Sequence, residues 1–408
     1  EIPEFKFKKI EINGTNDQQK KYIMRGFHAN DNEIFGMEEL RKGYFRLLSD
    51  NMISEILPHA KYNYNDSTFT LILDVKMAED MSVRIGGNVG SNGANQIYLG
   101  ASYHNLGKFF KEFALEGQLG EIYNNLQMTG RIDFPTEIPT SFRMILSLSS
   151  FDYKSQTKNF FNQKNSPIFN KKNEKFIKAY INMPFLSKHK AEFGVGMATL
   201  ADQYFQTNVI DFTNSARDKS EYKILGGSVA LEGNTLDSKL FAVSGKKERL
   251  AANIYWGAET FKQGTGTDPY DGNFKYKQAW LQISYEVEKY FRLGRRVSLG
   301  SYVNAYYSSR NFSNNYRATM MQAGEFSPTT HSKISYNEAF RANQFIGAGV
   351  IPIYKFNNMI HARLGLYGFV PIFPINCNET NKATYGKMFS KFEYMGDLAL
   401  VVRLPFGS

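Results

Sequence analysis

The chain has 408 residues, a formal net charge of +10 and no apolar run near the 18 residues of a membrane-spanning helix, which excludes transmembrane helices. Its Lys and Arg residues are spread along the chain without a zinc-ligand spacing, a helix-turn-helix or a stacking motif, so we expect no nucleic-acid partner. Aromatic residues make up 15% of the chain and Cys377 is the only cysteine, which favours a strand-rich protein and excludes an internal disulfide.

The first 80 residues predict a small α+β unit. A strand is expected in residues 5–14, where the turn residues Asn13 and Gly14 end it. Residues 17–27 and 37–57 have the apolar spacing of helices. Two more strands follow, of which 67–77 is the clearer because apolar and polar residues alternate along it. The order strand, helix, helix, strand, strand describes one sheet with two helices.

From Ser82 onward one pattern recurs, and residues 279–288 (AWLQISYEVE) show it well. Leu281, Ile283 and Tyr285 alternate with polar residues such as Gln282 and Ser284, and a period of two is that of a strand. About fourteen such segments occur, each of roughly nine to fourteen residues, a length that suits strands tilted across a bilayer.

The connectors between these segments alternate between short and long. Short ones include HNLGKF, FPTEIPTS, PFLSKH, FRLGRR and KFNN, and long ones lie near 154–174, 206–220, 263–275, 310–340 and 373–388. A soluble sandwich has no reason to sort its loops by end, whereas an outer-membrane barrel has short periplasmic turns and long outer loops. The sequence therefore predicts a transmembrane barrel whose apolar strand faces meet lipid.

Local motifs point to a family. The entry I-x-I-x-G (Ile10, Ile12, Gly14) and the late strand 67–77 resemble a POTRA domain, a periplasmic module that binds polypeptide by adding a strand to a sheet edge. The alternative is another small domain of ferredoxin size. The turn Asn234-Thr235-Leu236-Asp237, followed by residues 241–245 (FAVSG), resembles the N-x-x-D and F-P-x-x-G turn of the bacterial surface antigen superfamily, with Ala242 in place of proline.

That superfamily includes barrel insertases and two-partner secretion transporters, and it carries a long loop inserted in the lumen between the eleventh and twelfth strands. Here the longest outer loop, about 310–340, falls at that place. The run 325–345 followed by 346–354 is similar to barrels attached to bacterial patatin-like phospholipases of the Bacteroidetes type. Those proteins have a patatin hydrolase, a single POTRA and a sixteen-stranded barrel, so the resemblance implies a hydrolase before Glu1.

The loop suggests a candidate site. The family's loop has a V-R-G-[FY] signature whose arginine pairs with an acid on the barrel wall. The nearest match is Phe340-Arg341-Ala342-Asn343, which lacks the glycine. We expect residues 311–340 to fold into the lumen and a basic residue such as Arg341 to pair with a wall acid, the alternative being a mobile surface loop. The candidate acids are Glu286, Glu288, Glu393 and Asp397.

No enzyme is expected in this chain itself. A patatin hydrolase needs a G-x-S-x-G elbow and a D-G-[GA] partner. The nearest sequences are Gly226-Gly227-Ser228, inside an expected barrel strand, and Asp271-Gly272-Asn273, which we interpret as a turn. The six histidines have no metal spacing, so we expect no catalytic residue, cofactor or metal. Lys171 and Lys172 could contact lipopolysaccharide phosphates or could simply be solvated.

These observations predict a POTRA-like periplasmic domain in residues 1–80 and a transmembrane β-barrel in 81–408, mostly β and antiparallel, in a bacterial outer membrane. The expected function is to anchor an N-terminal patatin-like hydrolase, and the sequence leaves open whether the barrel also exports it or only holds it. The alternative is an insertase or polypeptide transporter without an enzymatic passenger. Expected partners are outer-membrane lipids, with lipopolysaccharide a further candidate, and a polypeptide or the hydrolase. A plain channel is disfavoured because a porin needs no POTRA.

The family's sixteen strands exceed the fourteen found here, and Gly407-Ser408 does not provide the terminal aromatic residue that the resemblance implies. We therefore expect one further hairpin of roughly 25 residues after Ser408. Because an unpaired strand edge in hydrocarbon is costly, the first and last strands should show a gap between residues 82–90 and 391–404.

Overall fold

The computed structural model describes most of the chain in two compact units, one made of residues 1–83 with 101–113 and one of the remainder. The division expected at residue 80 stays a prediction. The described residues are 6–27, 35–48, 53–64, 67–77, 80–88, 95–106, 109–134, 138, 140–153, 170–185, 189–206, 216–238, 241–264, 274–330, 332–334, 336–357 and 359–402. Among them, no helix is long and apolar enough to span a membrane.

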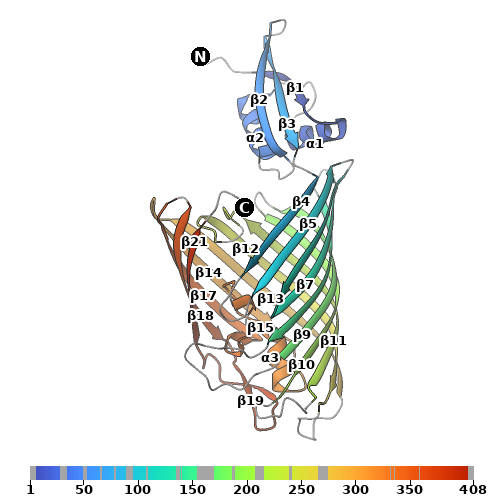
Figure 1. Cartoon of the computed structure of the whole chain (residues 1–408), viewed down its shortest axis with the longest axis vertical. Helices are drawn as coiled ribbons and strands as arrows, with labels where there is room; N and C mark the ends of the chain where they lie inside the picture. The colour runs from blue at the N-terminus through green and yellow to red at the C-terminus, as the bar shows by residue number, and fades with distance from the viewer. Residues whose placement is uncertain are drawn as a thin grey trace. The chain divides into compact units, whose positions relative to one another are not determined.

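The N-terminal unit contains a three-stranded sheet of order β1-β3-β2, in which β1 and β3 are parallel and β2 and β3 antiparallel (Figure 1). Ile23 and Leu73 are fully buried at the centre of its hydrophobic core. Gly14 has a φ of 81°, and an added Cβ would lie 2.4 Å from the carbonyl oxygen of Val75, so the turn requires glycine. The elements are β1 (Phe7–Asn13), α1 (Asp17–Phe27), α2 (Met37–Leu48), β2 (Ile53–Asn63) and β3 (Thr68–Met77).

The expected order of elements in this unit is confirmed, but the expected second helix is too long. α2 ends at Leu48, and residues 53–57 already belong to β2. The apolar residues Ile53 and Ile56 fit a helical period, yet they are buried as part of the strand, where Ile53 pairs with Met77 and Ile56 with Val75. The pairing of this segment with β3 therefore determined its conformation, and the helical spacing of a few apolar residues was not enough to make it a helix.

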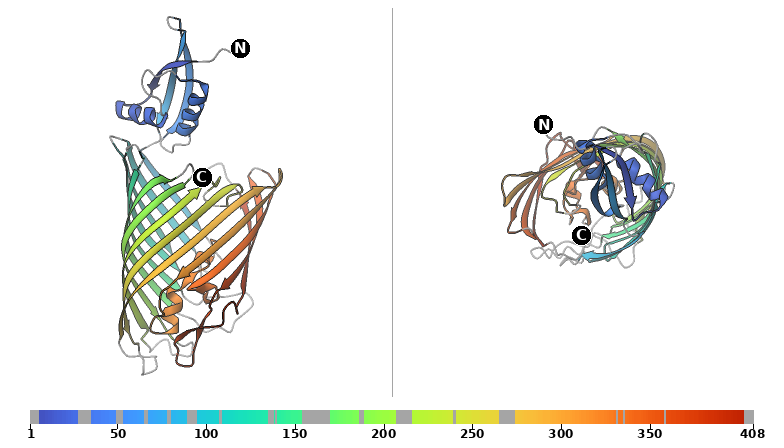
Figure 2. Two further views of the ribbon diagram at one scale, coloured as in Figure 1. Left: turned by 180° about the vertical axis from the view of Figure 1, so that it is seen from behind. Right: turned by 90° about the horizontal axis from the view of Figure 1, so that it is seen from above.

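The large sheet of the chain is antiparallel and has fourteen strands, and it curves into a barrel wall (Figures 1 and 2). Most of it lies in the second unit, and parts of its first three strands belong to the first. Each strand pairs with its neighbour in the chain, and β4 and β21 stand at the two ends of the order. The strands are β4 (Met81–Asn88), β5 (Gln96–Leu106), β6 (Phe110–Gly120), β7 (Tyr123–Phe134), β8 (Thr140–Tyr153), β9 (Asn170–Phe185), β10 (His189–Tyr204), β11 (Asp218–Asn234), β12 (Gly245–Lys262), β13 (Phe274–Arg292), β14 (Val297–Ser308), β17 (Gln344–Lys355), β18 (Ile360–Pro371) and β21 (Glu393–Val402).

Within the described residues β4 and β21 do not pair, so the sheet has the gap expected between its first and last strands. The further hairpin after Ser408 stays a prediction. The strand count of fourteen is confirmed, as is the position of the long loop between the eleventh strand, β14, and the twelfth, β17.

The two faces of the wall are those expected from the alternation. On β13, Leu281, Ile283 and Tyr285 are 40%, 39% and 37% exposed, whereas Trp280 on the opposite face is 6% exposed. On β21, Leu398 and Leu400 are 79% and 66% exposed. An outward apolar face with an inward polar face is the arrangement of a membrane barrel, in which lipid replaces a protein core.

The connectors also follow the expected sorting. Connectors such as 293–296, between β13 and β14, lie at one end of the wall, and the segments that join β14 to β17 and β18 to β21 lie at the other. Two small hairpin elements occur in these long segments, β15 (Gly324–Glu325) with β16 (Arg341–Ala342), and β19 (Ile375–Cys377) with β20 (Ala383–Tyr385). The segment 309–343 also contains the helix α3 (Tyr316–Gln322). The expected long connectors near 154–174, 206–220 and 263–275 lie largely outside the described residues.

Candidate functional site

Residues 309–343, which we call the lumen loop, turn inward from the ends of β14 and β17. Seen from above, orange segments of the colour of this part of the chain lie inside the curved wall (Figure 2). Most of α3 is buried, with Ala318 at 0% and Met320 and Met321 at 2% exposure. The alternative of a mobile surface loop is therefore wrong for the described part of this segment. What holds the loop is a set of contacts to the inner wall.

Gln322 at the end of α3 forms one of these contacts. Its Nε2 donates to Oδ2 of Asp202 on β10 at 2.6 Å, and Asp202 is fully buried. Nη1 of Arg310 donates to Oε1 of Gln322 at 3.0 Å, and the Arg310 guanidinium lies over the rings of Tyr222 and Trp280 at 4.9 and 4.8 Å. A buried carboxylate needs such donors and a nearby cation because desolvation of its charge is costly.

Asn315 forms a second contact at the start of the helix. Its side-chain oxygen caps α3 by accepting from the backbone N–H of Ala318 at 2.8 Å. The same amide donates from Nδ2 to the hydroxyl of Tyr204 on β10 at 2.8 Å, and that hydroxyl lies 3.0 Å from Oγ of Ser220 on β11. Asn315 is 1% exposed and Tyr204 is 0% exposed. One residue therefore both starts the helix and attaches it to the wall.

The third contact is an aromatic cluster at another part of the wall, on β17 and β18. Phe326, 1% exposed, packs against Phe345 and Phe369 of the wall with ring centroids 6.1 and 5.7 Å away, and against Phe340 of the loop at 6.5 Å. Gly347 of β17 makes room for it, since an added Cβ there would lie 2.1 Å from a carbon of the Phe326 ring. The wall is shaped to receive this side chain.

Arg341 is buried in the loop, but its partner differs from the expected ones. Its Nη2 forms an ion pair with Oε2 of Glu325 at 2.5 Å across the β15–β16 hairpin. Its Nη1 lies 3.4 to 3.5 Å from the carbonyl oxygens of Met320, Met321 and Ala323, where α3 ends. Carbonyls at a helix C-terminus lack partners and attract a cation. Burial raises the pKa of Glu325, and the guanidinium of Arg341 opposes that rise.

Three of the four expected wall acids have other described contacts, and the fourth, Asp397, has an inward position on the wall. Glu286 accepts from the hydroxyl of Tyr302 at 3.2 Å, and Glu288 accepts from the hydroxyl of Tyr290. Glu393 pairs with Lys391 at 3.3 Å, and Asp397 faces inward on β21. No described ion pair joins Arg341 to any of these four carboxylates, so that specific pairing is corrected to Glu325. A functional role for Arg341 stays a prediction.

The turn between β11 and β12 packs into the wall at the end with the short connectors. Oδ1 of Asp237 accepts from the backbone N–H groups of Val243 and Ser244 at 3.0 and 3.3 Å, which explains the N-x-x-D spacing. Phe241 has a φ of 54°, and the Arg363 guanidinium of β18 lies over its ring at 5.4 Å. Ala242, where the motif has proline, is 2% exposed.

Near the same end, an ion-pair network joins four strands across the inner wall. Glu192 of β10, 2% exposed, binds Arg143 of β8 at 2.7 Å and Arg249 of β12 at 2.8 Å. Arg249 also binds Glu232 of β11 at 2.7 Å. Each charge has a partner of opposite sign, which is the condition for burying it.

The residues that attach the loop were not predicted. Asp202, Gln322, Asn315 and Arg310 come from segments far apart in the sequence, and only their local patterns could have indicated them. Asn315 precedes a helical segment as a cap does, and Asp202 stands among apolar residues near a strand end. Neither pattern indicates which residue the side chain contacts.

Among the described residues, the sequence nearest to a hydrolase elbow is part of a barrel strand. Ser228 lies within β11, as expected, and not at a strand-to-helix turn. Residues 271–273 lie outside the described residues. Among the residues described, no group of three His, Cys, Asp or Glu side chains could hold a metal ion.

No family model and no curated protein sequence matches the chain. The solved structures that are similar to it include the following two. The crystal structure of BamA from Haemophilus ducreyi lacking POTRA domains 1–3 has a TM-score of 0.61 at 12% identity, over 99% of this chain and 79% of that one. CdiB from Escherichia coli has a TM-score of 0.54 at 11% identity, over 98% of this chain and 70% of that one.

At this identity the similarity shows the fold. The expected class is confirmed: a mostly β, antiparallel barrel with a small α+β unit before it. A barrel with an apolar outward face belongs in an outer membrane, as the sequence predicted.

Proposed function

We propose that the chain is the POTRA-barrel part of an outer-membrane protein of the bacterial surface antigen superfamily, and that it inserts or transports polypeptide. The observation that carries the proposal is the docked lumen loop. A barrel whose lumen holds a helix, a hairpin and an aromatic cluster is poorly suited to free diffusion of solutes. The similarity in fold to BamA and CdiB supports the same conclusion.

Strand edges supply the chemistry for binding a polypeptide. An exposed edge has unpaired N–H and C=O groups, and an extended peptide can add to it as a further strand. β2 is an edge of the N-terminal sheet, and its residues from Leu57 to Asn63 are exposed. In the barrel, β4 and β21 end the strand order of the described sheet. Pairing at such an edge is strongly favoured in a membrane because an orphan backbone group in hydrocarbon costs several kcal/mol.

A second candidate follows from the sequence. The resemblance of residues 325–345 to barrels of patatin-like phospholipases supports a role as anchor for an N-terminal hydrolase. The similar solved structures do not add support to it. Both candidate functions use the barrel and the strand edges in the same way. They differ in the molecule that the edges bind, which is a polypeptide in transit in the first and the attached hydrolase in the second.

Depletion of the full-length protein from its host distinguishes these functions. Quantitative proteomics of the outer membrane should show a fall in folded barrel proteins for an insertase, or cell retention of a secreted polypeptide for a transporter. A variant without the N-terminal residues 6–77 should show the same defect, because β2 is lost. Unchanged barrel and secreted proteins together with a loss of phospholipid hydrolysis would refute polypeptide handling and support the hydrolase anchor.

A further inference from the structure

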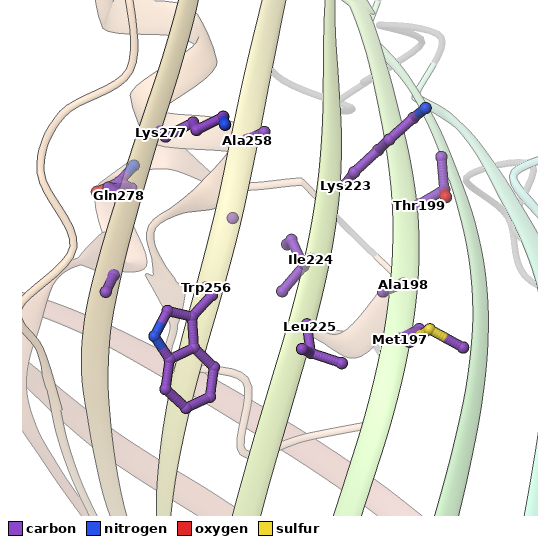
Figure 3. Close-up of a pocket in the computed structure, with 12 residues that line it drawn as sticks. Met197, Ala198, Thr199, Lys223, Ile224, Leu225, Trp256, Ala258, Lys277 and Gln278 are labelled. Carbon is purple, nitrogen blue, oxygen red and sulfur yellow. The ribbon is translucent and has the colours of Figure 1, made fainter.

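A groove of about 750 Å³ lies on the outward surface of the barrel wall, across β10 to β13 (Figure 3). Met197, Leu225 and Trp256 beside it are 59%, 51% and 50% exposed, so they stand on the lipid-facing side. Two small side chains lie next to these large ones and leave the groove open: Ala279, which pairs with Trp256, and Ala258, which pairs with Lys223 and Lys277. The lipid-facing surface of the wall therefore has a depression here, whereas the apolar band of a barrel is usually flat.

The chemistry of the groove changes along the strands. The strand pairing aligns Met197, Leu225, Trp256 and Ala279 in one apolar row. It aligns Thr199, Lys223, Ala258 and Lys277 in the next outward-facing row, two residues nearer the long loops on each strand. The close-up shows Lys223 and Lys277 on one side of the groove and Trp256, Leu225 and Met197 on the other (Figure 3).

The apolar part continues toward the middle of the wall. A second groove of about 570 Å³ is lined in part by Val195, Gly227, Ile254 and Leu281. These four residues form the next outward row below Met197, Leu225, Trp256 and Ala279. The two grooves thus follow one another along the same strands, with length for acyl chains.

The two lysines are positioned for anions. Both side chains are exposed, and no carboxylate of a described residue forms an ion pair with either ammonium group. They are two strands apart, about 10 Å at the usual spacing of strands. The nearest outward acid, Glu221, pairs with Lys219 at 2.5 Å, and exposed Lys262 and Lys275 add further positive charge toward the loops.

We propose that this groove is a binding site for a phosphorylated glycolipid of the outer leaflet, of the lipid A type. Its acyl chains lie in the two apolar grooves, and its two phosphate groups meet Lys223 and Lys277. The proposal rests on the orientation used above, in which the long loops face the cell exterior. Charge complementarity favours this occupant over a zwitterionic phospholipid, and the separation of the lysines favours two phosphates over one.

Titration of the detergent-solubilised full chain with diphosphoryl lipid A, followed by native mass spectrometry, tests the site. Monophosphoryl lipid A and phosphatidylglycerol are the comparison lipids. We expect the double variant K223Q/K277Q to bind diphosphoryl lipid A about 30-fold more weakly, because two interfacial lysine contacts are lost. The variant A279L, which fills the groove and keeps both lysines, should weaken binding at least about tenfold.

The matched control is K111Q/K289Q, which removes two exposed outward lysines near the opposite end of the wall. It should bind within about twofold of the parent chain. Heat-modifiable gel mobility confirms that each variant is a folded barrel. Equal binding by K223Q/K277Q and the control, or equal affinity for phosphatidylglycerol, would overturn the site. Polypeptide handling is measured separately by depletion, so either idea can fail alone.

Discussion

The aromatic contact between the lumen loop and the wall gives the most direct perturbation of the docked state. Phe326→Ala removes the ring that fills the space beside Gly347. Gly347→Val attacks the same contact from the wall, because an added Cβ at this position would lie 2.1 Å from a ring carbon and the ring must move away. Gly130→Val is the matched control, since an added Cβ there meets nothing within 4 Å.

The size of the effect follows from burial. Phe326 is 1% exposed, and an aromatic side chain buries roughly 150–250 Å². At about 25 cal/mol per Å² this gives about 4–6 kcal/mol as an upper estimate, and Phe→Ala changes in cores cost about 3–5 kcal/mol. A loss of about 4 kcal/mol raises the undocked population of the loop about a thousandfold.

Two assays report undocking. Arg341 is 7% exposed in the docked loop, so tryptic cleavage after it should accelerate when the loop leaves the wall. Conductance of the full chain in planar bilayers should rise as the lumen empties. The parent chain and Gly130→Val should be cleaved slowly and conduct little, whereas both contact variants should be cleaved faster and conduct more.

The double variant distinguishes this contact from general destabilisation. Because both changes remove one interaction, Phe326→Ala with Gly347→Val should be little worse than either single variant, with a coupling free energy near that of one change. Additive effects in the cleavage rate would refute the reasoning. Slow cleavage and unchanged conductance in all three variants would also refute it.

Changes at Arg341 and Asn315 test the remaining contacts of the lumen loop, and labelling of Cys377 tests the orientation of the barrel. Arg341→Ala should lower the free energy of unfolding by about 3–5 kcal/mol, measured by denaturant, because it leaves Glu325 buried without its cation; Arg341→Lys should restore part of the loss. Asn315→Ala should cost about 1–2 kcal/mol, because the cap of α3 is lost, and tryptic cleavage should accelerate accordingly. Burial raises the pKa of the Cys377 thiol, so maleimide should label it on intact cells more slowly than a free cysteine at pH 7. Its labelling rate should climb with pH until the thiolate dominates, and no labelling of intact cells at any pH would contradict the outward position of the long loops.

The barrel was predictable because its main signals are local. Alternation along residues such as Leu281 to Tyr285 depends only on the period of the strand, and the sorting of connectors depends only on their lengths. Both signals can be recognised without knowing which residues a segment contacts in the fold. The second helix of the N-terminal unit failed for the opposite reason, since Ile53 and Ile56 fit two periods and the pairing of β2 with β3 chose between them.

The site was predictable only in part. The position of the loop between the eleventh and twelfth strands followed from counting, and Arg341 followed from a motif. The partner of Arg341 could not be predicted. Glu325 lies opposite Arg341 because β15 pairs with β16, and strands of two residues are too short to show a period in the sequence. The contact of Gln322 with Asp202 joins residues 120 positions apart. Such contacts depend on how far the loop enters the lumen, and this depth cannot be derived from the spacing of residues in the sequence.

The central claim, that this protein binds polypeptide at its strand edges, is tested most directly by photo-crosslinking in living cells. A photoreactive residue in place of Ala60, exposed on the edge strand β2, should give adducts that contain other polypeptides. The same residue in place of Gln18, exposed on α1, is the control and should give few. Mass spectrometry of the adducts should identify outer-membrane or secreted proteins at position 60. Equal adducts at both positions, or no polypeptide adduct at position 60, would contradict the account.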